Sequence, residues 1–429
     1  MDDLKAWLSQ PEVATFPFAG VLAEIRAVGK HAVPVELLSD LDNARQRLSV
    51  GRTEGTDLNS EQLAAFLDTV LDRRDGRFDA ATYLALRLLP LPETRDGELG
   101  EAWRRHDRLM VALVADLLRF EQEAMDGSTG LLPRHRPGPA LVDRRLRLGM
   151  RALAPAYTRL GLPVLGGTDP ADADRVCASV AARMPAAQRL AVDLSMLPVD
   201  ISHDEFMFIR VLQAYETVFA LMAAQLHTAV SVLTMGNVRL AAIFTDGAAS
   251  ALRDASPLFS LMATMQPCSF AAFRTHTHGA SAIQSAAAKT VEALCRTPDP
   301  QRLASCAFDQ VPQVRQAILD GSLVGLEDVY QHHLAAGKVQ PRHGRKLEEA
   351  MYGLGVVVDR WRTTHHRLAT RFLGNEPGTA ASQGAAYLDR VRTIPVFHRP
   401  AVASDTPGGG PRTRSARPPA VMPAGRARS

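Results

Sequence analysis

Apolar residues recur every three or four positions along most of the chain, whereas runs that alternate polar with β-branched residues are absent from the sequence. The first pattern is typical of amphipathic helices, and the second would indicate strands. The sequence therefore predicts an all-α protein. We expect helices over residues 60–73, 80–89, 99–125, 141–159, 171–193, 203–232, 237–252, 281–296, 312–319, 325–336 and 343–373.

Proline and glycine clusters divide this helical pattern into three regions. At 429 residues the chain exceeds the usual size of a single domain. We expect an N-terminal helical region over 1–200, a second helical domain over 201–398 and a tail over 399–429. The tail is rich in Pro, Gly and Arg and has few apolar residues to bury, so it is predicted to be disordered.

Charge and cysteine content narrow the class of protein. Six arginines and one aspartate give the tail a formal charge of +5, so the body carries −2 of the net +3, and no nucleic-acid partner is expected. The four cysteines show no Cys-x-x-Cys spacing and follow no secretory leader. No uninterrupted apolar stretch reaches the roughly 18 residues of a membrane span. We expect a soluble cytoplasmic protein with reduced, buried thiols and no membrane association.

A helical stripe near the C-terminus carries a candidate metal ligand. Trp361, His365, Leu368 and Phe372 recur at spacings of four, three and four, so they share one face of a helix. An imidazole on such a face can ligate haem iron, but a hydrogen-bonded core histidine gives the same pattern more often. The neighbouring His366 points about 100° away around the helix and would need a different wall.

A second apolar face belongs to the helix that begins near His203. It is formed by Phe208, Leu212, Tyr215, Phe219 and Met222. This face is wide enough to cover a flat ligand, and an ordinary core helix is the alternative. His203, Asp204 and Glu205 are not expected to bind a metal together, because consecutive helical residues point in different directions. We predict Asp204 and Glu205 as first-turn charges that interact with the helix dipole, with Ser202 as the cap.

Four segments, taken in order, follow the pattern of a known family. Residues 82–89 give a weaker match, and residues 203–216 and 273–285 give closer ones, the last with Phe-Arg followed by Ser-Ala-Ile-Gln-Ser. The C-terminal segment has Trp361, His365, Leu373-Gly374, Gly378-Thr379, Ser382, Gly384 and Tyr387-Leu388. Mainly between residues 200 and 395, the chain thus resembles the tryptophan 2,3-dioxygenase superfamily, which includes the indoleamine 2,3-dioxygenases.

The resemblance implies a helical bundle of the haem dioxygenase type with an enlarged N-terminal helical region. It implies haem b as the cofactor, with its iron bound by His365 and with Trp361 and Ser281 beside it. An aromatic amino acid would be the substrate and O2 or peroxide the oxidant, in a homo-oligomer that is a dimer or a tetramer. The positions that match the family's catalytic and substrate-binding residues are Phe208, Leu212, Arg274, Thr379 and Tyr83.

Each of these positions carries an expected role. In the family, the residue at Phe208 packs against the substrate ring, and the arginine at Arg274 grips the carboxylate through the fork of its guanidinium. Thr379 would belong to a closing lid. Tyr83 matches a pocket tyrosine that the family takes from a neighbouring subunit, although buried packing explains it equally well. Glu216 matches a glutamate that we expect to be structural.

The chain departs from the family's pattern in three places. Leu212 replaces a histidine and cannot accept a proton, although the indoleamine branch functions with a serine there. Ala380 and Ala381 replace glycines and restrict positive φ in the expected lid. Residues 93–200 fill a gap that is short in tryptophan dioxygenases, so they are either an insertion or part of an enlarged N-terminal domain.

We therefore expect a divergent haem-dependent oxygenase that acts on the aromatic ring of tryptophan or a similar amino acid, as a tailoring step in secondary metabolism. A haem-dependent aromatic hydroxylase or peroxygenase of the tyrosine type is the first alternative. A non-catalytic haem-binding helical protein is the second, and a helical scaffold without haem is the third. His276 and His278 have no counterpart in the family and could line the pocket or lie exposed.

Overall fold

The computed structural model describes residues 2–50, 58–93, 100–163, 167–374, 376 and 384–398. The described residues up to Phe397 belong to one compact unit. Within the described residues the regular structure is helical, and the β-structure consists of one isolated bridge between Arg134 and Ser202. The all-α prediction is confirmed. The predicted disordered tail lies outside the described residues.

Most predicted helices are present, and three differ from the prediction. They are α4 (Leu58–Val70), α6 (Glu101–Asp126), α7 (Pro139–Arg159), α10 (His203–Thr234), α11 (Val238–Asp254), α17 (Pro312–Leu319), α18 (Leu326–Ala335) and α19 (Pro341–Leu373). The predicted helix 171–193 is split at Pro185 into α8 (Ala173–Arg183) and α9 (Ala186–Leu194), because proline cannot donate the next helical hydrogen bond. The predicted helix 80–89 is only α5 (Ala80–Tyr83) followed by the 3₁₀ turn η3 (Leu86–Leu88).

Several helices were not predicted. They are α1 (Asp2–Ser9), α2 (Phe18–Val28), α3 (Val35–Val50), α12 (Ser256–Met262), α13 (Pro267–Arg274), α15 (Pro300–Leu303), α16 (Cys306–Asp309) and α20 (Ala385–Arg392). The predicted helix 281–296 begins as the 3₁₀ turn η5 (Ala282–Gln284) and continues as α14 (Ala286–Cys295). The remaining 3₁₀ turns are η1 (Val13–Thr15), η2 (Lys30–Ala32) and η4 (Pro170–Asp172).

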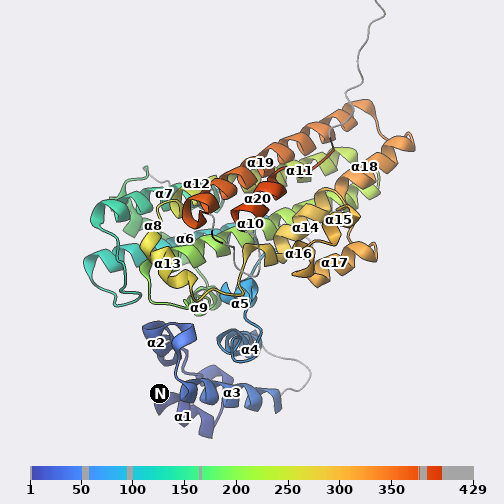
Figure 1. The fold of residues 1–429 in the computed structure, drawn as a ribbon. Helices are drawn as coiled ribbons and strands as arrows, with labels where there is room; N and C mark the ends of the chain where they lie inside the picture. The colour runs from blue at the N-terminus through green and yellow to red at the C-terminus, as the bar shows by residue number, and fades with distance from the viewer. Residues whose placement is uncertain are drawn as a thin grey trace, which may run out of the picture. The chain divides into compact units, whose positions relative to one another are not determined.

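Helix α10 is the central element of the main helical body (Figure 1), where it packs against α6, α11 and α14. Among the described residues it is the one helix long and apolar enough to cross a membrane by length and composition. However, 67% of its most apolar window is buried inside the protein, as in a core helix. The main hydrophobic core around α10 also includes residues of α6 and α7, and both of these helices precede residue 200.

The start of α10 is tied to α7 by a buried ionic network. The guanidinium of Arg145 donates to Glu121 at 2.9 Å and to Asp204 at 2.8 Å, and all three side chains are buried. Asp204 also accepts from the backbone N–H of Gln266. Ser202 is the N-cap residue of α10, as predicted, but its hydroxyl forms no cap hydrogen bond and instead donates to Asp200. Asp204 is therefore an internal partner of an arginine as well as a first-turn charge.

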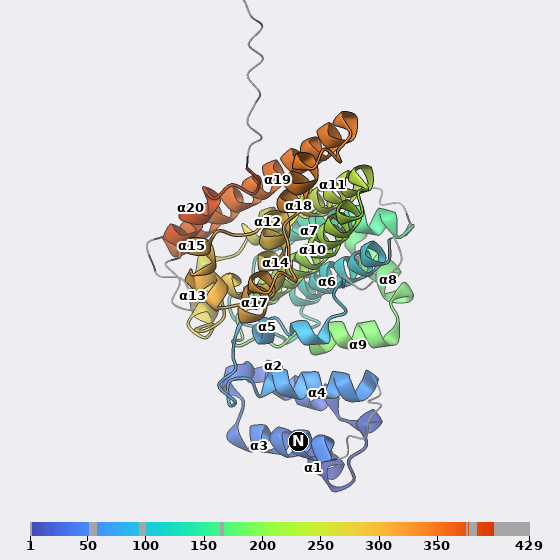
Figure 2. The ribbon, with the colours of Figure 1, turned by 90° about the vertical axis from the view of Figure 1, so that its right-hand side faces the viewer.

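Helices α1–α4 lie together around a second core (Figure 2). This N-terminal core contains apolar residues between Leu4 and Leu71, and it also takes in Ala85, Leu88, Leu194 and Leu197. Beneath its surface the Lys30 ammonium lies 2.7 Å from the Asp72 carboxylate, and both side chains are fully buried. The backbone N–H of Lys30 donates to the Pro198 carbonyl at 2.7 Å, so the N-terminal core is joined directly to the loop before α10.

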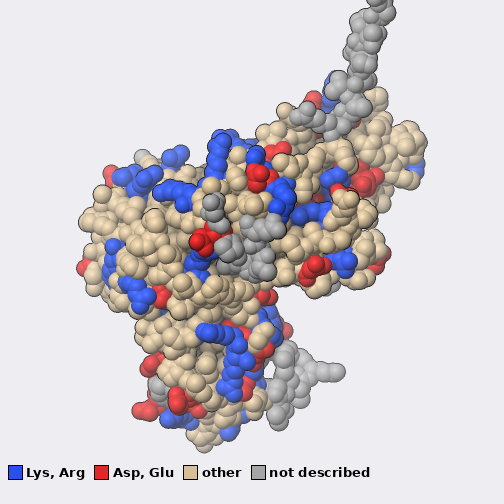
Figure 3. Space-filling view, viewed as in Figure 1, with Lys and Arg blue, Asp and Glu red and all other residues tan. Residues whose placement is uncertain are grey.

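The surface and the cysteines complete the fold. On the face drawn in Figure 3, basic and acidic side chains are interspersed among larger neutral areas. The four cysteines are free thiols. Cys295 is buried, but Cys268 and Cys306 are exposed, so the expectation of buried thiols is wrong for these two, which lie at the beginnings of short helices.

Candidate functional site

A cavity of about 360 Å³ lies between α10 and α19 and is also lined by residues of α5, α12, α13, α14 and α20. Its lining is mainly apolar. All residues of the two predicted apolar faces line the cavity. These are the stripe of α19 from Trp361 to Phe372 and the face of α10 from Phe208 to Met222. The structure brings seven predicted site residues together here, namely Tyr83, Phe208, Leu212, Arg274, Ser281, Trp361 and His365. The eighth, Thr379, lies outside the described residues.

His365 is placed on the α19 wall with no polar partner in the described part of the chain. Its ring lies 5.1 Å from Trp361 and 6.2 Å from Phe259 between centroids. Burial, with a smaller contribution from the neighbouring His366, lowers the pKa of His365 to about 4. The imidazole is therefore neutral at pH 7, which is the form that binds a metal. His366 points elsewhere, with its Nε2 3.7 Å from the Asp389 carboxylate, as its place on the helix predicted.

Two polar atoms in this wall are buried without a well-formed hydrogen bond. They are the Nε1 of Trp361 and the hydroxyl of Tyr215, whose rings lie 6.0 Å apart. Burial raises the pKa of Tyr215 well above its ordinary value, so the phenol stays protonated. A side-chain interaction with Trp361 partly offsets that effect, so the two groups are partners of each other in this wall.

Aromatic rings form the end of the cavity near the start of α10. Phe208 lies 5.1 Å from Phe273 and 6.2 Å from Phe270, and Phe270 lies 5.4 Å from Phe372. Leu212 follows one turn after Phe208 and lines the same space. This end can hold an aromatic ring through face and edge contacts. Leu212 offers that ring no hydrogen-bonding group.

Polar side chains reach the cavity from α10, α13 and the segment before α14. Arg274 ends α13 and lines the cavity. Ser281 caps η5 in a capping box with Gln284, so it stabilises the backbone there as well as lining the cavity. Glu216 is buried, and burial raises its pKa to about 7 despite a hydrogen bond with Ser285. Glu216 therefore presents a titratable carboxyl to the cavity, which its expected structural role did not predict.

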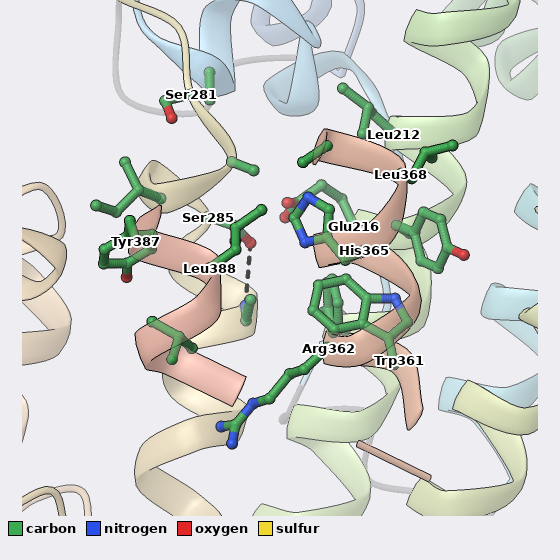
Figure 4. A pocket seen from close by; sticks show the side chains of 18 of the residues that line it. Leu212, Glu216, Ser281, Ser285, Trp361, Arg362, His365, Leu368, Tyr387 and Leu388 are labelled. Carbon is green, nitrogen blue, oxygen red and sulfur yellow. Dashed lines mark hydrogen bonds between the residues drawn. The ribbon is translucent and has the colours of Figure 1, made fainter. Parts of the chain in front are cut away.

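Basic residues gather at a further part of the lining. Lys289 and Arg302 both pair with Glu292, at 2.9 Å and 2.6 Å. Arg362 follows Trp361 on α19, donates to the Ile394 carbonyl at 2.6 Å and has its side chain 10% exposed. In Figure 4, Trp361 and His365 project from α19, and Tyr387 and Leu388 of α20 lie across the cavity. Lys289 and Arg302 share Glu292, and Arg362, 3.9 Å from Asp359, adds a third cation to this part of the lining, which therefore carries excess positive charge.

These features fit a haem group. A flat apolar macrocycle matches the cavity between two apolar helix faces, and a neutral imidazole with no polar partner among the described residues matches an iron ligand. The excess positive charge suits the two carboxylates that haem b carries. His365 would hold the iron, and Trp361 would lie beside it.

Sequence reasoning missed part of this lining. Phe259 and Phe270 lie on α12 and α13, short helices whose periodicity is too brief to detect. The signal that existed was the phenylalanine at position 270, three residues before Phe273. His276 and His278 line a separate hollow with His31, Arg73 and Phe78, and both are exposed.

Comparison with known proteins places the chain near one group of enzymes. No protein-family model matches it. It is 25% identical over 228 residues to a protein of Anaeromyxobacter dehalogenans (strain 2CP-C) and 27% identical over 229 residues to one of Anaeromyxobacter sp. (strain K), each match covering 47% of this chain and 86% of the relative. A protein of Xanthomonas campestris pv. campestris (strain B100) is 23% identical over 227 residues, which is 46% of this chain and 76% of the relative.

These relatives are tryptophan 2,3-dioxygenases. The likeness to the tryptophan 2,3-dioxygenases is distant and covers less than half of the chain. It supports the tryptophan and indoleamine dioxygenase superfamily, and with it an oxidoreductase of the dioxygenase type. The roles of the individual site residues stay predictions.

Proposed function

We propose that the protein is a haem-dependent oxygenase that inserts oxygen into the aromatic ring of tryptophan or a tryptophan-like amino acid. The observation that carries this proposal is His365, a neutral imidazole without a polar partner in the described part of the chain, on the wall of a cavity that α10 covers with apolar side chains. The names of the distant relatives support the same reaction class.

Haem, when bound, supplies the redox-active iron that activates the oxidant. The protein's own residues position the substrate. Phe208, with Phe270 and Phe273, packs against the aromatic ring, and the guanidinium of Arg274 binds the carboxylate. Tyr83 completes the wall beside Phe208, at 6.4 Å between ring centroids. These contacts hold the ring close to the cofactor in one orientation, which lowers the barrier through proximity.

Leu212 limits the chemistry that the cavity wall can contribute. A leucine neither accepts a proton nor hydrogen-bonds an indole N–H, so the distal wall contributes orientation and exclusion of water. This difference from the family's histidine favours a tailoring reaction over bulk tryptophan breakdown. It also keeps a haem-dependent aromatic hydroxylase or peroxygenase as the second candidate, since insertion of one oxygen atom into a phenol ring needs no acceptor for an indole N–H.

An optical titration followed by product analysis tests the proposal. Haem-loaded protein is titrated with L-tryptophan and with L-tyrosine, and each mixture is then supplied with O2 and a reductant or with peroxide. A shifted Soret band with tryptophan and a product heavier by two oxygen atoms support the proposal. One added oxygen atom on tyrosine supports the hydroxylase instead. Haem binding with no response to either amino acid contradicts both and indicates a non-catalytic haem protein.

A further inference from the structure

One wall of the cavity is a helix of four residues that other parts of the chain hold in place. Helix α5 and the next residue supply Ala80, Tyr83 and Leu84 to the lining. The following residue, Ala85, has φ 48°, in the left-handed region. A residue with a Cβ adopts this conformation only where its surroundings hold it there. The position of this wall is therefore set by its anchors and not by helix propensity.

Three hydrogen bonds anchor the wall. The Gln284 side chain accepts from the backbone N–H of Ala80 at 2.9 Å. The Gln213 side-chain amide donates to the carbonyl of Leu84 at 2.9 Å. The third anchor is the hydroxyl of Tyr83, which donates to Oε1 of Glu205 at 3.2 Å. Of these three bonds, only the one between Tyr83 and Glu205 is made by a side chain that lines the cavity.

Glu205 is itself held rigidly. Its Oε1 accepts from the backbone N–H of Val199 at 2.8 Å, and its Oε2 accepts from that of Asp200 at 2.9 Å. The side chain is completely buried. Its partners lie outside the first turn of α10, so a role as a solvated charge at the helix N-terminus does not explain it. The prediction made for Glu205 from the sequence accounted for its place in the helix but not for these contacts.

The loop that supplies these N–H groups rests on the N-terminal core. Lys30 binds the carbonyl of Pro198, and the Arg26 guanidinium donates to the carbonyl of Met196 at 3.0 Å. Gly29 approaches so closely that a Cβ there would lie 2.6 Å from the carbonyl oxygen of Val199. A continuous set of contacts thus runs from η2 through Val199 and Glu205 to Tyr83.

We propose that Glu205 is a positioning residue for the substrate end of the cavity. It fixes the Tyr83 ring beside Phe208 and joins that wall to the N-terminal core through the loop 195–202. Glu205 itself does not line the cavity. This proposal rests on the proposed function in one respect, which is that the amino-acid substrate binds at the aromatic end of the cavity.

Three variants and a matched control isolate this contact. Tyr83→Phe removes the hydroxyl and leaves Glu205 with both backbone donors, whereas Glu205→Ala removes the acceptor. Glu205→Gln keeps an oxygen that can accept from Tyr83, so its effects should be smaller than those of Glu205→Ala. The control is Tyr330→Phe, because Tyr330 donates to Glu348 at 2.7 Å in the same kind of bond outside the cavity lining.

The first measurement is backbone hydrogen exchange in the full-length protein, which requires neither haem nor substrate. We expect exchange over residues 80–88 to be roughly tenfold faster in Glu205→Ala and in Tyr83→Phe, as for the loss of one buried hydrogen bond. Tyr330→Phe should leave this segment unchanged. Unchanged exchange over residues 80–88 in both cavity variants would overturn the proposal.

The second measurement is the dissociation constant of haem-loaded protein for L-tryptophan and L-tyrosine. We expect it to rise roughly tenfold in Tyr83→Phe and Glu205→Ala while the Soret absorbance is retained, with a smaller rise in Glu205→Gln. Faster exchange with unchanged affinity would show a purely structural role and reject the proposal. If the wild-type protein responds to neither amino acid, the proposed function fails, and hydrogen exchange alone then decides whether Glu205 holds α5.

Discussion

The indole ring of Trp361 lies 5.1 Å from the imidazole of His365, at an interplanar angle of 56°. The two residues are one turn apart on α19, and Trp361 also contacts the rings of Tyr215 and Phe219. The tryptophan therefore bridges α19 and α10 next to the histidine. Packing of this kind restricts the rotation of the imidazole, as the proposed role of His365 in holding iron requires.

Replacing His365 by alanine should abolish haem retention. His365 has no hydrogen bond among the described residues, so its removal should leave helix content and thermal stability nearly unchanged. His366→Ala is the control, because His366 points toward Asp389. Soret absorbance after reconstitution and gel filtration measures the difference, and far-ultraviolet circular dichroism checks the fold. A full Soret band in His365→Ala would refute the assignment.

Replacing Arg274 by lysine should weaken substrate binding. A lysine keeps the charge but loses the paired donors that match a carboxylate, which costs about 1.5–3 kcal/mol, or roughly 10- to 150-fold in affinity. Arg253→Lys, on α11 and outside the cavity lining, is the control. Titration with the amino acid and with its decarboxylated amine separates the effect. Arg274 would not be the carboxylate ligand if the variant lost equal affinity for both compounds.

Replacing Arg145 by methionine should destabilise the fold strongly. The change leaves Asp204 buried without its cation and Glu121 with only the His203 imidazole, and breaking a buried pair in this way costs about 3–5 kcal/mol. Arg119→Met is the control, since Arg119 is 57% exposed and its pairs with Asp116 and Glu123 are worth less than about 1 kcal/mol. Urea unfolding measures both free energies. Equal losses in the two variants would show that the buried network contributes no more than the surface pairs.

Glu205 should make the protein less stable as the pH rises. Burial raises its pKa from 4.5 to about 8, so between these values the folded protein holds a proton that the unfolded chain has released. The free energy of unfolding therefore falls as the pH increases from 4.5 through 8, and the contribution is fully present below 4.5. The groups that face the carboxyl are Tyr83, Asp200 and, through charge, Lys30.

The check is the slope of unfolding free energy against pH in wild type and Glu205→Gln. Glutamine cannot titrate, so this part of the slope should vanish in the variant even though its amide fits the two N–H donors less well. Parallel slopes would mean that Glu205 titrates normally in the folded protein.

The two long helix faces of the site could be predicted from the sequence, and the contacts between distant segments could not. The stripe of α19 and the face of α10 repeat over several turns, so their period identifies them. The bond between Tyr83 and Glu205 joins residues 122 positions apart, and nothing in local spacing indicates it. Ser202 illustrates the same limit, because it has the right type and place for a cap and yet contacts Asp200.

The short and polar helices were the hardest to predict. Charged residues interrupt the apolar pattern of α3, so this helix has only a weak apolar face. Helices α12 and α13 span only 7 and 8 residues. Such segments are helical mainly because of what they pack against, which a single sequence does not display. Phe259 and Phe270 were missed for this reason.

The composition of the N-terminal core has a consequence for synthesis on the ribosome. Leu194 and Leu197 belong to that core together with residues as early as Leu4. Helices α1–α4 therefore emerge long before two of the side chains that seal them, and they cannot finish packing until the chain has been translated past Leu197. During that interval their apolar surfaces are open to chaperones and to other nascent chains.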